Sequence, residues 1–210
     1  MAEVTIKTAT DVANLGLGLA GIERILSIDD EGNIPKTCAT MLPVSKREVL
    51  EQFPWSCALA RVKLAEDSTP PAFGWSKSFT LPNDCMRPWF VNGYRLPHSR
   101  FVHEQSKIMS NEGPIEVLYV RDIPYALMPE TLKLAIAAAM VANGARAFGM
   151  SEKSASYAFE IYDLKLGVAV EADKGGGALE TARDVDQLAN YRNGLDNEGF
   201  EQTKVNIVGG

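Results

Sequence analysis

Residues 16–21 carry the spacing best known for binding a phosphate. They spell Gly-x-Gly-x-x-Gly, which cradles a dinucleotide when a strand precedes it and a helix begins after it. Here the preceding residues 11–15 continue a helical pattern, and no strand–helix–strand unit follows. Each glycine inside a helix costs about 1 kcal/mol relative to alanine. We therefore interpret these glycines as part of a helix that packs tightly on a neighbouring helix.

The other candidates for chemistry are also isolated. His98 and His103, with Arg100 between them, have no nucleophile or further metal ligand at a useful spacing. Lys174 precedes Gly175–Gly177, whereas the lysine of a phosphate-binding loop follows its glycines, so this stretch is interpreted as a linker. The sequence predicts no catalytic residue, no cofactor and no metal.

Composition and charge restrict the class of protein further. The 210 residues are 46% hydrophobic and 23% charged, which is typical of a globular chain with its own core. The longest stretch without a polar side chain, residues 134–142, is far shorter than the roughly 20 residues of a membrane helix. We expect no membrane partner and no secretory signal. The net charge of −6 argues against coating nucleic acid by bulk attraction.

Three cysteines, Cys38, Cys57 and Cys85, form no Cys-x-x-Cys pair. An odd number of separated cysteines fits buried, reduced thiols in a cytosol better than a disulfide framework.

Apolar spacing predicts two helices before residue 64. The first opens at Thr10 and Asp11 and follows a stripe of Val12, Leu15, Leu19, Ile22 and Leu26. The second covers residues 35–52 and is either kinked at Pro43 or restarted at Ser45, which opens a capping box.

Two more helices are predicted after residue 128. One begins at Pro129 and ends near Gly149. The other is capped by Ser151 and has a stripe of Ala155, Ala158, Phe159, Tyr162, Leu166 and Ala169.

The region between these helix pairs has a different composition. Prolines, aromatics and short apolar runs predict a small β-domain, with the clearest strand at residues 115–120. The predicted fold class is α+β, mainly a bundle of four helices with an inserted antiparallel β-domain and an extended C-terminal arm. The boundaries are 1–69 and 126–172 for the bundle, 70–125 for the insert and 173–210 for the arm.

Aromatic residues suggest where the bundle meets the insert. Trp55 follows a proline at a helix end, and Phe73, Trp75 and Phe79 lie at the start of the predicted β-domain. We expect these four rings to be buried together at a junction, with Asp84 capping its own turn and Arg87 paired with an acid.

Several of these elements occur together in one known family. The helix ending in Ile25–Ile28, the Pro-Trp element within Val49–Ala58, and the Pro-x-x-Gly and Leu-Pro-x-Asp-Cys-x-Arg elements within Pro71–Arg87 resemble the tail tubular protein A family. A shortened Tyr-x-x-Arg element, Tyr119–Arg121, precedes the last helix pair. The family comprises head-to-tail adaptors of short-tailed bacteriophages. The resemblance covers residues 10–172, although Phe53 stands where the family usually has histidine.

The resemblance implies a structural virion protein without catalytic residues, made in the host cytoplasm. It implies a ring, generally a dodecamer, between the portal protein of the capsid and the nozzle protein of the tail, with a channel through which double-stranded DNA passes. The bundle is expected to face neighbouring subunits. The loop at residues 96–111, with His98, Arg100 and His103, is expected to contact the nozzle.

The arm after Asp173 is expected to dock on the portal, because Gly175–Gly177 free it from the bundle and its apolar residues are too sparse to fold alone, so it should become ordered on a partner. We expect the contact to involve Leu179, Val185, Leu188, Tyr191, Phe200, Val205 and Ile207. Two alternatives stay open on the sequence alone. One is another ring component that completes the tail, and the other is an α+β domain that binds a small molecule or catalyses a reaction through its glycine-rich N-terminus.

Overall fold

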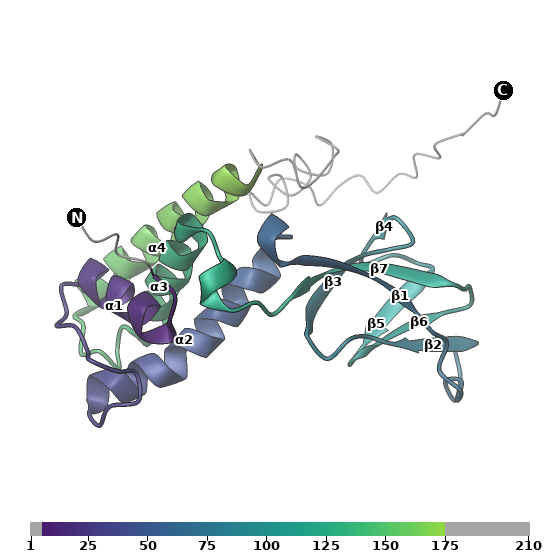
Figure 1. Cartoon of the computed structure of the whole chain (residues 1–210), viewed down its shortest axis with the longest axis horizontal. Helices are drawn as coiled ribbons and strands as arrows, with labels where there is room; N and C mark the ends of the chain where they lie inside the picture. The colour runs from purple at the N-terminus through teal and green to yellow at the C-terminus, as the bar shows by residue number, and fades with distance from the viewer. Residues whose placement is uncertain (1–5, 175–210) are drawn as a thin grey trace.

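The computed structural model describes residues 6–174, so the predicted arm after Lys174 lies outside the described residues. The fold is α+β, as predicted. Four helices form one end of an elongated molecule, and the strands inserted between the second and third helices form the other end (Figure 1). The helices are α1 (Ala9–Leu19), α2 (Asn33–Gln52), α3 (Glu130–Gly144) and α4 (Glu152–Lys174). No helix in this part of the chain is both long and apolar enough to cross a bilayer.

Helix α3 is the centre of the bundle, and α1, α2 and α4 each pack against it. Its side chains are buried all round, including those of Ala135, Ile136, Ala137, Ala138, Ala139 and Met140. Alanine side chains are short, so three helices can approach one central helix closely. Lys133 of α3 is buried as well, and its Nζ donates to the backbone oxygen of Ile6 and to Glu130 Oε1, at 2.6 and 2.7 Å.

Helix α1 is shorter than its apolar stripe predicts. A capping box between Thr8 and Asp11 starts it, two residues before the predicted opening. It ends at Leu19, and Gly21 then adopts a φ of +68°. The side chain of Asn14 accepts from the N–H of Ile25 and donates to its carbonyl oxygen, both at 2.9 Å. The chain therefore turns back before Leu26, which is 95% exposed instead of continuing the helical stripe.

The remaining helix ends confirm some predictions and correct others. α2 runs as a single helix through Pro43, so the predicted restart at Ser45 is wrong. Ser45 is buried in the helix and accepts from Asn143 Nδ2 of α3 at 3.0 Å. α3 ends five residues before Gly149, which instead lies in the following turn with a φ of +73°. Ser151 caps α4 as predicted, because its Oγ accepts from the N–H of Ser154.

The predicted stripe of α4 holds with one exception. Ala158, Tyr162, Leu166 and Ala169 are buried and Ala155 is half-buried, whereas Phe159 is 49% exposed. Phe159 shares the helical spacing of the stripe, so spacing alone does not bury its ring.

The inserted β-domain begins earlier than predicted. Strand β1 occupies Leu59–Leu64, inside the range assigned to the bundle, so the boundary at residue 70 is wrong. One sheet has the order β1-β7-β3-β4, and the other has the order β2-β6-β5. The further strands are β2 (Lys77–Thr80), β3 (Cys85–Val91), β4 (Tyr94–Arg95), β5 (Phe101–Glu104), β6 (Lys107–Ser110) and β7 (Ile115–Arg121). All pairings are antiparallel, and β7 contains the predicted strand at 115–120.

Two hydrophobic cores are present. The first core fills the helical bundle, includes Ala58 just before β1, and extends into the sheet through Trp89 and Val120. The second core lies between the two sheets and consists of Leu64, Phe79, Leu81, Val91, Phe101, Ile108, Ile115, Val117 and Tyr119. Strand β7 contributes to both, since Val117 and Tyr119 face the second core and Val120 reaches the first. The bundle and the β-domain are therefore joined by packed side chains as well as by the chain.

Gly16 shows why α1 carries glycines. A Cβ built on Gly16 would lie 2.6 Å from the carbonyl oxygen of Ala137 and 2.9 Å from the Cε of Met140, both on α3. The close approach of α1 to α3 therefore requires glycine at this position, which confirms the interpretation of tight helix packing. A Cβ on Gly18 of the same helix would meet no atom within 4 Å.

These two glycines provide a matched pair for a stability measurement. We predict that Gly16→Ala lowers the free energy of unfolding by about 1 to 3 kcal/mol, because the methyl group collides with α3 backbone. Gly18→Ala should raise it by about 0.5 to 1 kcal/mol, because alanine favours the helix and meets nothing. Urea unfolding of both variants followed by circular dichroism tests this. An equal change in the free energy of unfolding for both substitutions would show that α1 and α3 do not pack closely at Gly16.

Candidate functional site

The Pro-Trp element after α2 anchors the junction between the bundle and the β-domain. The ring of Trp55 is 1% exposed, and its Nε1 donates to the carbonyl oxygen of Val49 at 2.9 Å. Phe53 packs edge-on against it with ring centroids 5.1 Å apart. The chain therefore leaves α2 in a direction fixed by two buried rings.

Arg87 of β3 ties the sheet to the end of α2. Its Nη1 donates to the carbonyl oxygen of Glu51 at 2.7 Å, and its guanidinium carbon lies 4.4 Å from the centroid of the Trp89 ring. The predicted pairing of Arg87 with an acid is therefore wrong, because a helix-terminal carbonyl accepts the hydrogen bond instead. Trp89 is buried in the first core, and its Nε1 has no hydrogen-bond partner among the described residues.

The second chain crossing, after β7, is held by polar contacts. The carboxylate of Asp122 binds Lys46 Nζ of α2, and that ammonium lies 5.0 Å from the ring centroid of Tyr125. Burial, together with the nearby Asp122 carboxylate, raises the pKa of Tyr125. Asp84 accepts through its backbone oxygen from the N–H of Asp122 and through Oδ1 from Tyr119 Oη. Asp84 thus holds β7 rather than capping its own turn.

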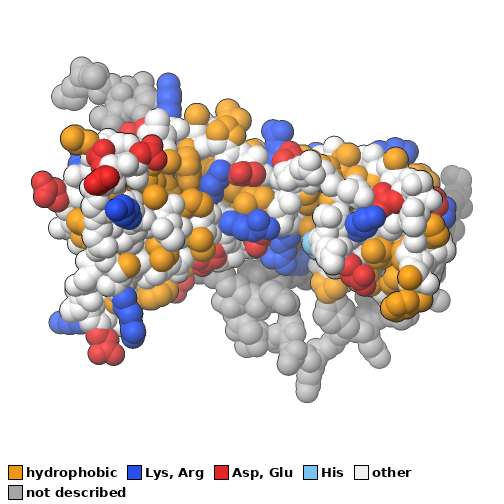
Figure 2. All heavy atoms as spheres, turned by 90° about the horizontal axis from the view of Figure 1, so that it is seen from below, with side chains coloured by type: hydrophobic (Ala, Val, Ile, Leu, Met, Phe, Trp, Pro, Cys, Tyr) orange, Lys and Arg blue, Asp and Glu red, His pale blue; other side chains and the backbone are white. Residues whose placement is uncertain are grey.

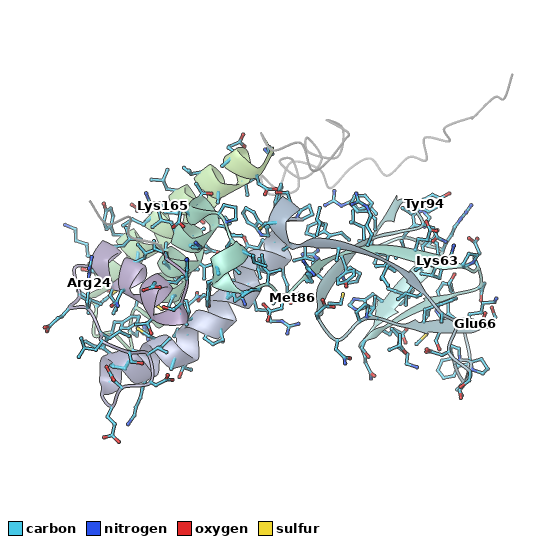
Figure 3. All side chains as sticks on the ribbon, viewed as in Figure 1. Arg24, Lys63, Glu66, Met86, Tyr94 and Lys165 are labelled. Atoms are coloured by element: carbon cyan, nitrogen blue, oxygen red, sulfur yellow. The ribbon has the colours of Figure 1, made fainter. Side chains whose placement is uncertain are left out.

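The predicted aromatic cluster at the junction is only partly correct. Trp55 lies there, but Phe79 belongs to the second core between the sheets. Trp75 is half-buried and Phe73 is 88% exposed, in the segment that joins β1 to β2. Figure 3 shows Glu66, from that segment, at the end of the β-domain farthest from the helices, and Met86 at the junction.

The second ring at the junction comes from Trp89, which the sequence analysis missed. The signal was present, since Pro88-Trp89 repeats the Pro54-Trp55 pair. Lys46 was missed too, because nothing in the sequence relates it to Asp122.

A groove of about 490 Å³ opens beside Arg87. Its walls come from β3, the β4–β5 connection and β5, and none of the lining side chains is acidic. They are Arg87, Pro88, Leu96, Pro97, His98, Ser99, Phe101, Val102 and His103. In the view of Figure 2, Lys and Arg side chains gather near the middle of the molecule, next to a histidine.

The structure brings two of the three residues of the predicted nozzle-facing loop into this groove. His98 stacks on Tyr94 with ring centroids 4.5 Å apart, and His103 is an exposed residue of β5. Arg100 lies outside the groove lining, over the Tyr94 ring and 3.8 Å from Glu112. Most of the predicted loop at residues 96–111 forms the β5–β6 hairpin. Phe101 of β5 and Ile108 of β6 are buried in the second core.

The end of α4 is fixed at the junction. Asp173 Oδ1 accepts from Ser56 Oγ at 2.6 Å, and the same carboxylate accepts from the Ser56 N–H. The helix continues to Lys174, so the predicted start of the arm at residue 173 is wrong. Leu179, Val185, Leu188, Tyr191, Phe200, Val205 and Ile207, predicted for portal docking, lie outside the described residues.

The cysteines are free thiols. Burial raises the pKa of Cys38 to about 11 and, aided by neighbouring carboxylates, that of Cys57 to about 11 and of Cys85 to about 12. These thiols are therefore protonated at neutral pH and weakly nucleophilic. Among the described residues, no three His, Cys, Asp or Glu side chains gather as a metal site.

Neither a protein-family model nor a curated protein sequence matches this chain.

The central role of Trp55 can be measured. We predict that Trp55→Ala lowers the free energy of unfolding by about 3 to 5 kcal/mol, because it removes a fully buried ring from the first core. Trp55→Phe should cost less, since it keeps a ring against Phe53 and loses mainly the hydrogen bond to Val49. Chemical unfolding monitored by circular dichroism compares the two. A loss below about 1 kcal/mol for Trp55→Ala would place this ring outside the core.

Proposed function

We propose that this protein is a structural virion protein that forms the ring-shaped adaptor between capsid portal and tail nozzle. Support comes first from the sequence elements that resemble the tail tubular protein A family. Trp55 and Arg87, from two of those elements, each donate to a carbonyl oxygen near the end of α2, and Asp84 holds the chain crossing after β7. Elements far apart in the sequence thus serve one purpose, which is to fix the β-domain on the bundle.

The observation that carries the proposal is an apolar stripe on the outer face of α4. Tyr157, Leu164 and Val168 are 62%, 62% and 50% exposed, and Ile161 lies between them at helical spacing. Their spacing of three and four residues matches the seam of paired helices. Exposed apolar side chains gathered on one face mark a protein–protein interface. In a ring, such a face meets a different face of the next subunit.

The charge of the chain is compatible with a channel for DNA. Each copy carries a net charge of −6, so a ring of copies repels phosphate and allows double-stranded DNA to slide without sticking. The negative charge therefore favours passage of DNA and not stable binding of DNA.

The geometry of the glycine motif lends no support to the alternative of a nucleotide-binding domain. Gly16 and Gly18 lie in the last turns of α1, and Gly21 follows its end. A helix C-terminus presents carbonyl oxygens, whereas an anion is bound by N–H groups at a helix N-terminus.

The stripe on α4 can be tested by its effect on assembly. Leu164→Glu should abolish ring formation or weaken it at least tenfold, because it places a carboxylate in the apolar seam. Ser156→Glu adds the same charge to an exposed position of α4 beside the stripe and should leave assembly unchanged. Native mass spectrometry of the wild-type protein and both variants measures the ring population. A wild-type protein that never forms rings, alone or with portal rings, would contradict the proposal.

The two ends of the adaptor can be tested separately. A chain truncated after Lys174 keeps the Asp173–Ser56 contact and should form rings that no longer bind portal rings. The substitution Arg100→Glu changes an exposed side chain outside the groove lining, does not touch the second core, and should block only nozzle attachment. Cosedimentation with each partner measures both effects. Portal binding by the truncated chain would contradict the role assigned to the arm.

A further inference from the structure

The groove beside Arg87 has a charge pattern opposite to that of the whole chain. Residues 85–103 contain three arginines and two histidines but no acid, in a protein of net charge −6. Arg87, His98 and His103 all line the groove, with apolar Pro88, Leu96 and Pro97 between them. Such a surface suits a ligand that carries both carboxylates and apolar groups.

The donors in the groove are matched to carboxylates. Arg87 has five N–H donors in its guanidinium, and Nη1 makes its only hydrogen bond to the described residues. The two imidazoles offer further N–H donors. Arg100, which pairs with Glu112, is left out of this site because it does not line the groove.

The same chain contains a segment with the complementary pattern. Residues 195–201 read Leu-Asp-Asn-Glu-Gly-Phe-Glu, with three acids, no base and two large apolar side chains. We propose that in the free subunit, before the arm docks on the portal, this segment of the same subunit binds in the groove, with its carboxylates on Arg87, His98 and His103 and with Leu195 and Phe200 against the prolines.

The end of α4 makes this contact reachable. Asp173 binds Ser56, and Glu51, five residues before Ser56, accepts from Arg87 of the groove. The chain therefore continues from Lys174 close to one wall of the groove. Residues 175–194 can span up to about 70 Å when extended, far more than this separation requires.

The two histidines are the only ones in the chain, so chemical modification of histidine reports on the groove alone. The experiment uses the full chain and measures, by mass spectrometry, how fast diethyl pyrocarbonate modifies His98 and His103. The test variant carries the three substitutions Asp196→Asn, Glu198→Gln and Glu201→Gln. A matched control variant neutralises the other three acids after Lys174 through Glu180→Gln, Asp184→Asn and Asp186→Asn.

We expect the test variant to raise the modification rate of both histidines severalfold, and the control to keep the wild-type rate. The wild-type rate should not change with protein concentration, because the contact lies within one subunit. Equal rates in all three proteins, an equal rise in both variants, or protection only at high concentration would overturn the proposal. Ring formation plays no part in this measurement, so its outcome is independent of the proposed function.

Discussion

The structure depends on the close packing of three helices around α3. That packing is possible because the middle of α3 is rich in alanine and because α1 has glycine where it crosses Ala137. A larger side chain on either helix would separate them and leave unfilled space in the first core. The position of every other element follows, since α4 is placed by α3 and the β-domain is placed by the end of α2.

Contacts at the junction fix the position of the sheets relative to the helices. Trp55 and Trp89 belong to the first core, although one follows α2 and the other lies in β3. Arg87 and Lys46 add polar contacts at the two chain crossings. The proposed adaptor role requires such a connection, because a load on one end must reach the other without the two parts separating.

The periodicity of apolar residues predicted the helices and strands that depend on local sequence. It failed at positions where a contact with a distant residue determines the structure. The four helices, the start of α3 and strand β7 follow from spacing and capping residues. Leu26 continues the stripe of α1 in sequence, but the hydrogen bonds of Asn14 to Ile25 end the helix first. Ser45 has the spacing of a cap, yet Asn143 makes it an interior residue. Phe73 was expected at the junction but is exposed, whereas Trp89, to which no role was assigned, is buried there, because aromatic type alone does not say which rings enter a core.

If the packing around α3 holds the molecule together, α3 is its most stable element. Native-state hydrogen exchange measures this directly, because the slowest amides exchange only when the whole protein unfolds. We predict that the amides of Ile136–Val141 exchange most slowly, with the free energy of global unfolding, and that those of β3 and β7 at the junction follow closely. Faster exchange in α3 than in the second core between the sheets would contradict it.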